Sequence, residues 1–312
     1  MSYFSKIRPI AAAKAKIKKF VAEEFPFIAA LPAMIWQIFF SIIPVLAMLV
    51  YSFIGNESTN NFLGIFTTDF YTNVAKPPYF KAIYNSLLLA AGSVFGCLLF
   101  SFPVAYLIAF YINKRFQPLA VILMMLPLWT NFIIRIYSWF FLLDKRGILT
   151  SVLLNLGILQ QSTQFLFSPW VTIIGMIYCY YPFMLLPIYL SMADIRNELI
   201  EASADLGANT FQTLRFLIIP SCLDEMIYSS IMIGLMAFGE FAIPELLGGA
   251  KHSFWGSIIA NRFMLLRDFK TGAAYTFIGT VIILGISGFL YCLAMLIKNL
   301  ITNGFKNKGS LK

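Results

Sequence analysis

Long runs without a charged residue alternate with short polar segments along this chain. The first run lies between Glu24 and Glu57, and the second lies between Lys81 and Lys114. A helix needs about 20 apolar residues to cross the hydrocarbon core of a bilayer, and these runs are long enough. The pattern predicts six membrane-spanning helices, near residues 27–54, 85–112, 118–143, 170–191, 222–247 and 272–297.

One charge-free stretch, from Gly147 to Ala193, is too long for a single helix. Its middle is polar around residues 155–164, which predicts an external loop with a short interfacial helix before the fourth span. The spans are read as continuous helices, with one break at Pro244 in the fifth, because proline removes a backbone donor and clashes with the preceding turn.

Composition supports a membrane protein. Of the 312 residues, 60% are hydrophobic and 12% are charged, and the mean hydropathy is +0.80. A soluble domain carries about 25% charged residues, so this chain has too little polar surface to be a water-soluble globule. The predicted fold class is an all-α polytopic membrane protein with about six transmembrane helices.

The net charge of +9 concentrates at the two ends of the chain. Basic clusters beside apolar spans indicate cytoplasmic segments and contacts with anionic lipid, so lipid is predicted as a partner and nucleic acid is not. An even number of spans then places both termini in the cytoplasm. The predicted organisation is a basic cytoplasmic tail over residues 1–24, a transmembrane domain over 25–300 and a cytoplasmic C-terminal tail over 301–312.

Residues that support catalysis or metal binding are scarce. The chain has one histidine, His252, and its four cysteines form no Cys-x-x-Cys pair, so no metal site is predicted. It also lacks the Gly-x-x-x-x-Gly-Lys-[Ser/Thr] loop that holds nucleotide phosphates. No nucleophile–base pair is evident. We therefore expect no catalytic residue and no cofactor in this chain, and a transport subunit rather than an enzyme.

The segment 194–220, between the fourth and fifth predicted spans, is the one internal stretch with dense charge. Acidic and apolar residues each recur at helical spacing there, which predicts an amphipathic helix. Gly207 supplies a C-terminal stop in the left-handed conformation. Asn209 or Thr210 then caps a second helix that ends before Pro220. The pattern alone fits either an interfacial connector or a helix-turn-helix that inserts into a partner.

This segment resembles the EAA loop of ABC-importer permeases, through Glu201-Ala202-Ser203, Gly207 and Leu217-Ile218-Ile219-Pro220. The resemblance implies the type I ABC-importer permease fold and a coupling helix that docks in a cytoplasmic ATPase. It implies two copies of that ATPase, which bind ATP and Mg²⁺, together with a second permease subunit and an extracytoplasmic solute-binding protein. The residues that it assigns to ATPase coupling are Glu201, Ala202, Ser203, Asp205, Gly207 and Pro220.

Similarity over most of the chain is closest to the spermidine/putrescine branch of the binding-protein-dependent transport family. It rests on the segments 126–131, 134–137, 181–189, 205–208 and 239–249. The resemblance implies import of polyamines by alternating access, across the bacterial cytoplasmic (inner) membrane. Another small solute within the same family stays open as an alternative, as does a carrier driven by an ion gradient, whose expected marks are discontinuous helices in related halves.

Two charged residues lie deep inside predicted spans, away from the inner ends. Arg135 and Glu240 each follow about 18 residues from the inner end of a span, a rise of roughly 27 Å in a continuous helix. Such groups usually face a polar interior and have a partner. The pair therefore fits either a structural ion pair or an acidic entry site for an ammonium group, with Glu245 at the outer mouth. Neighbouring aromatic residues, Tyr180 among them, are read as belt or packing residues.

Overall fold

The computed structural model describes residues 25–54, 67–72, 74, 76–158, 161, 164–249 and 253–309, and its elements are helices. The basic tail predicted at residues 1–24, the single histidine His252 and the last residues of the C-terminal tail lie outside these ranges. The chain divides into two compact units, residues 1–68 and 69–312, which are taken one at a time below.

The first unit contains one long helical segment. It comprises α2 (Phe25–Gln37), the π-helix η1 (Ile38–Ile42) and α3 (Ile43–Tyr51). Its stretch Ala30–Tyr51 is long and apolar enough to cross a membrane, in agreement with the first predicted span. The wide π turn precedes Pro44: the Ile43 N–H donates to the carbonyl of Ile38, five residues back, and the helix continues through the proline.

Three long helices form the core of the second unit: α5 (Pro77–Phe110), α9 (Pro169–Ala193) and α12 (Ile219–Gly239). The first two confirm the second and fourth predicted spans. The last helix, α15 (Phe269–Gly309), packs on α12 and contains the sixth span. Five helices in the described residues are suited to cross a membrane, or six if one bent pair is counted, which confirms the predicted fold class.

Small residues bring α5 and α9 close together. A Cβ atom added at Gly92 would lie 3.2 Å from the Cδ1 of Ile173, and one added at Gly96 would overlap the Ile177 side chain. This Gly-x-x-x-Gly spacing lets helix backbones approach in a bilayer, where the hydrophobic effect does not drive helix association. The contact fixes the position of α9, which carries part of the candidate site.

The third predicted span is not one continuous helix, and this expectation was wrong. The chain forms α6 (Gln117–Met125), a 3₁₀ turn η4 (Leu126–Trp129) and α7 (Phe132–Leu143), with a bend of 89° at the break. The break has a local cause. Thr130 is extended, and Asn131 caps α7 by accepting hydrogen bonds from the N–H groups of Ile133 and Ile134, at 2.9 and 3.4 Å.

The fifth predicted span also has different ends. A short α11 (Thr210–Thr213) and the π-helix η5 (Leu214–Ile218) run directly into α12, so the helix does not stop before Pro220 as expected. Here too a π turn precedes the proline, with the Ile219 N–H donating five residues back. At its far end the helix stops at Gly239 rather than at Pro244, and α13 (Ala242–Gly248) follows.

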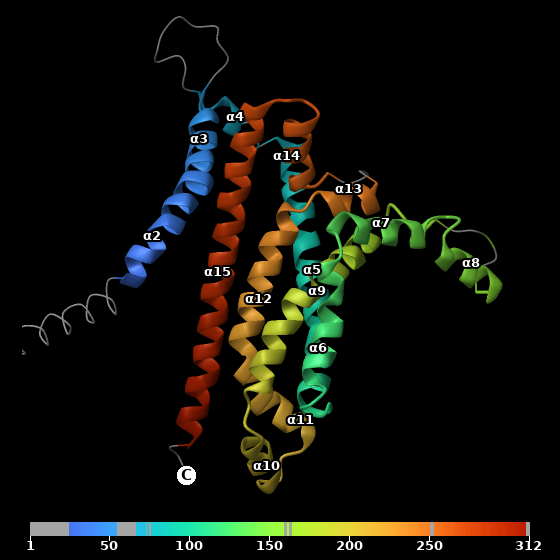
Figure 1. The fold of residues 1–312 in the computed structure, drawn as a ribbon, viewed down its shortest axis with the longest axis vertical. Coiled ribbons are helices and arrows are strands. Elements are labelled where there is room, and N and C mark those ends of the chain that lie inside the picture. Colours follow the sequence, from blue (N-terminus) through green and yellow to red (C-terminus); the bar gives the residue numbers. More distant parts are fainter. Residues whose placement is uncertain are drawn as a thin grey trace, which may run out of the picture. The chain divides into compact units, whose positions relative to one another are not determined.

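The remaining helices are short. The predicted loop after the third span contains α8 (Ile148–Asn155), while α4 (Asp69–Thr72) precedes α5. The sequence interpretation missed α14 (Trp255–Met264) and assigned its residues to an outer loop. Figure 1 shows α10 (Asn197–Asp205) and α11 at the end of this unit where α15 finishes, with α13 and α14 toward the other end.

Candidate functional site

The predicted turn at Gly207 is present. Gly207 has φ +77°, and it closes α10 with two backbone hydrogen bonds. Its N–H donates to the carbonyl of Ala204 at 2.8 Å, and the Ala208 N–H donates to the carbonyl of Ser203 at 3.0 Å. These bonds define a Schellman cap, which sets the direction in which the chain leaves the helix.

The second half of the loop starts from a capping box. The Asn209 side chain accepts from the N–H of Gln212, and the Gln212 side chain accepts from the N–H of Asn209, both at 2.8 Å. The hydroxyls of Ser203 and Thr213 lie 3.0 Å apart and join the two helices. The loop is therefore held as a rigid helix-turn-helix.

The outer side of this loop carries apolar residues as well as charges. Leu206 is 88% exposed and Phe211 is 66% exposed. Glu201, Ala202 and Asp205, which the sequence assigned to ATPase coupling, are exposed too. Pro220 lies apart from them, at the start of α12. Of the residues that the resemblance assigns to coupling, those on α10 and Gly207 are exposed, except that Ser203 is half-buried between the two helices.

Glu240 lies at the break between α12 and α13, where the backbone is extended. Its Oε1 accepts hydrogen bonds from the N–H groups of Phe241 and Ala242, at 3.1 and 2.8 Å. Its Oε2 accepts from the hydroxyl of Tyr180 on α9, at 2.6 Å. The carboxylate is therefore oriented by three donors.

Arg135 lies in the first turns of α7, just beyond the break in the third span. It is 8% exposed, and its Nε and Nη1 are buried without a hydrogen-bond partner. Its guanidinium carbon lies 5.8 Å from the centre of the Phe132 ring. The rise estimated for a continuous helix does not apply to Arg135, because the chain bends before it.

The structure leaves Arg135 and Glu240 unpaired. Within the described residues, neither forms an ion pair with an N–O distance of 4.0 Å or less. Glu245, the third predicted residue, is exposed in the first turn of α13. Sequence analysis did not identify Tyr180 as a partner of Glu240, because an aromatic residue in a span is usually a packing residue. Tyr180 directly precedes the segment 181–189, which is one of those that carry the family resemblance.

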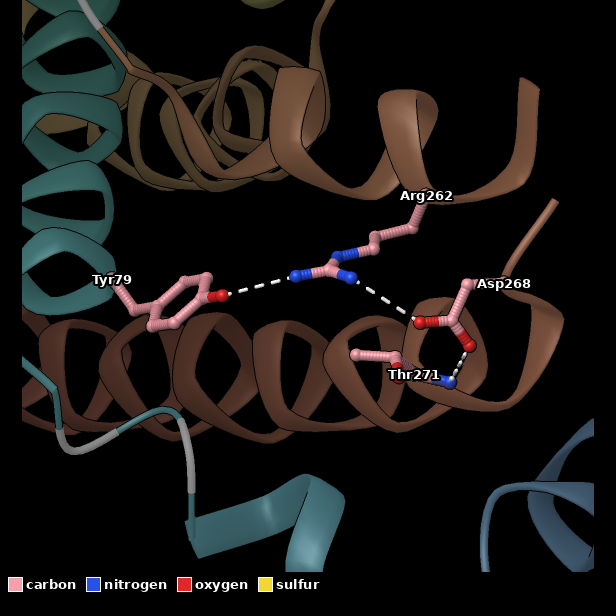
Figure 2. A network of polar contacts seen from close by, with 4 residues as sticks. All are labelled: Tyr79, Arg262, Asp268 and Thr271. Atoms are coloured by element: carbon pink, nitrogen blue, oxygen red, sulfur yellow. Dashed lines mark hydrogen bonds and ion pairs between the residues drawn. The ribbon is translucent and has the colours of Figure 1, made fainter. Parts of the chain in front are cut away.

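A second polar network connects α5, α14 and the start of α15. Arg262 donates from Nη2 to the Tyr79 hydroxyl at 3.1 Å and from Nη1 to Asp268 at 3.2 Å, as Figure 2 shows. Asp268 also accepts from the N–H of Thr271 and so caps α15. Arg262 lies between the fifth and sixth predicted spans, and through these contacts it holds α14 in place.

Residues 98–302 match the family described as the inner membrane component of binding-protein-dependent transport systems. The chain belongs to this family, so it is a transport component of the bacterial inner membrane and not an enzyme.

Relatives cover most of the chain. The spermidine/putrescine transport system permease protein PotB of Haemophilus influenzae is 35% identical over 273 residues, which is 88% of this chain and 95% of that protein. PotB of Escherichia coli is 34% identical over 256 residues, 82% of this chain and 92% of that protein.

Solved structures show the same fold. A bacterial alginate ABC transporter, in complex with an alginate pentasaccharide-bound periplasmic protein, superposes with a TM-score of 0.68 at 18% identity. The match covers 90% of this chain and 97% of that one. At this identity the likeness concerns the fold alone.

Proposed function

We propose that this chain is the membrane-spanning permease subunit of an ATP-driven importer for putrescine and spermidine. The observation that carries the proposal is the match to PotB proteins named for spermidine/putrescine transport, at 35% identity over 95% of one relative. A match over nearly the whole length includes both span breaks, and we propose that the solute passes beside them.

The chemistry of Glu240 fits a cationic solute. An alkyl diamine has ammonium groups separated by methylene carbons. A site for it needs a carboxylate to bind an ammonium group and apolar residues to contact the methylene carbons. Glu240 offers carboxylate charge at a helix break, and the Tyr180 hydroxyl and two backbone N–H groups fix its orientation. Oε1 already accepts two hydrogen bonds and Oε2 accepts one, so one acceptor position remains, on Oε2, for an ammonium group. Glu245 supplies a second, exposed carboxylate on α13.

The loop α10–α11 is the proposed docking element for the ATPase. Docking needs a rigid surface with apolar residues to bury, and the capped turn with exposed Leu206 and Phe211 supplies both. In this proposal two copies of the ATPase bind ATP and Mg²⁺ in the cytoplasm. A second permease subunit completes the pathway, and an extracytoplasmic solute-binding protein delivers the solute. The alginate importer, solved with its periplasmic protein, shares this fold.

The proposed orientation places α10 and the end of α15 in the cytoplasm. Figure 1 shows these segments at the same end of the second unit, which agrees with the basic residues predicted on that side. A continuous helix, Thr210–Gly239, leads from the loop to the Glu240 break. The ATPase-docking surface and the proposed solute site are thus joined by one helix, which can transmit a displacement.

The test is uptake of labelled putrescine and spermidine by cells without their own polyamine uptake, supplied with this chain and its partner proteins. We expect uptake that depends on the chain, and a Glu240→Gln variant that folds but transports at least about tenfold more slowly, since the ammonium loses a charge partner. Glu225→Gln, the same change near the other end of α12, is the control. Uptake that is independent of the chain would overturn the polyamine assignment. Parent-rate transport by Glu240→Gln would overturn the site.

A further inference from the structure

Arg135 is a buried cation with unmet hydrogen bonds. Nε and Nη1 have no partner within the described residues, and only 8% of the residue is exposed. A guanidinium cannot lose its proton in a protein, so it cannot relieve this burial by becoming neutral. An unpaired buried charge is costly, so a carboxylate partner would stabilise Arg135.

Glu240 is the candidate for that partner. It carries hydrogen bonds from Tyr180 and the backbone but has no cation within ion-pair distance in the described part of the chain. Both charges are connected to α9: the Tyr180 hydroxyl on α9 bonds Glu240, and α7, which carries Arg135, packs against α9. The helices that carry or follow these charges, α7 and α13, are in direct contact.

Both residues adjoin places where the backbone can turn. Arg135 follows the 89° bend between the two halves of the third span, and Glu240 is the extended residue between α12 and α13. Changes of backbone angle at such breaks move one helix against another without unfolding either. A small rotation of α7 against α13 is therefore a route by which the two charges meet.

We infer that Arg135 is an internal competitor of the solute for Glu240. This inference rests on the proposed function, because it takes the solute to be a cation. In the conformation seen here Glu240 is free of Arg135 and accepts an ammonium group. In the alternate conformation the guanidinium replaces the ammonium on the carboxylate, so the solute is released while the site keeps its charge balance. Alternating access requires such a difference in affinity between states.

Transport kinetics of the importer complex test this role. Arg135→Gln removes the competitor, so we expect a lower apparent KM for putrescine together with a lower maximal rate, each by about tenfold, the usual size of one partly screened charge interaction. Arg135→Lys keeps the charge and is expected to restore both parameters toward the parent values. Arg146→Gln, which changes an exposed arginine, is the control. A residue that only supports packing would lower the rate without lowering KM, and that result would overturn the inference.

A second measurement does not depend on the identity of the solute. Cysteines at positions 135 and 240, in a chain whose four native cysteines are replaced, are treated with a short thiol-to-thiol cross-linker in the assembled importer. We expect a higher yield when ATP and vanadate trap the complex than in nucleotide-free complex, because the two positions approach in the alternate state. Equal yields would refute the exchange. Absent polyamine uptake by the parent importer would instead refute the proposed function.

Discussion

Gly207 offers the sharpest test of the proposed coupling loop, because a side chain can be added there without a steric clash. A Cβ atom added there meets no atom within 4 Å, so Gly207→Ala introduces no collision. The substitution acts only on the backbone, which has φ +77° at this residue. An L-residue in the left-handed region costs about 1–2 kcal/mol, so the capped turn loses population by roughly five- to thirtyfold against alternatives.

A graded series separates this backbone effect from others. Asn tolerates the left-handed region better than Ala does, so Gly207→Asn is expected to have a smaller effect. Gly207→Pro is expected to be the most severe change. Proline fixes φ near −65° and removes the N–H that donates to the carbonyl of Ala204. Gly285→Ala is the control, since that position also has open space but lies within the last long helix.

The measurement is the affinity of the importer's ATPase for the permease in lipid nanodiscs, with transport measured in parallel. We expect the dissociation constant to rise in the order parent, Asn, Ala, Pro, with an increase of about fivefold or more for Ala. Thermal unfolding of the bundle should stay at the parent temperature, because the cap lies outside the packed core. An Ala variant that binds the ATPase as the parent does would refute the claim that this turn geometry is needed for docking.

Two further predictions concern the elements that position the site. Asn131→Ala removes the cap of α7 and is expected to cost about 1 kcal/mol, seen as a lower thermal midpoint in detergent, whereas Asn131→Asp should retain the parent midpoint. Gly96→Val forces α5 away from Ile177 and is expected to cost about 1–3 kcal/mol. Adding Ile177→Ala should recover part of that loss in the same melt, and a purely additive double variant would contradict the contact.

Three of the spans could be predicted from the sequence because a helix that crosses a bilayer must be apolar over about 20 residues. Charge-free runs of sufficient length located α5, α9 and α15, and each is found as a helix. The turn at Gly207 could also be predicted, since few residues other than glycine adopt the left-handed region that closes α10. Both inferences depend on local properties, the hydropathy of a run and the residue type at a turn, and these can be read from the sequence alone.

The helix breaks could not be found from hydropathy, because apolar composition is the same on both sides of them. The break before Arg135 follows from an extended Thr130 and the cap at Asn131, a signal that a search for capping residues inside apolar runs would have detected. The expected stop before Pro220 failed for a different reason. A π turn shifts the hydrogen-bond register ahead of the proline, and this adjustment depends on the whole helix rather than on the residue itself.

The charges and the breaks have a common physical origin. A helix that ends inside an apolar layer frees backbone donors, and these donors need an acceptor that lipid cannot provide. Glu240 provides it: its carboxylate binds the N–H groups of Phe241 and Ala242 where α13 begins. The N–H groups at the break therefore stabilise the half-buried carboxylate, and the carboxylate in turn satisfies those donors. Glu240 and Arg135 therefore lie at helix breaks instead of within continuous spans, and the cap at Asn131 is the local signal for the break before Arg135.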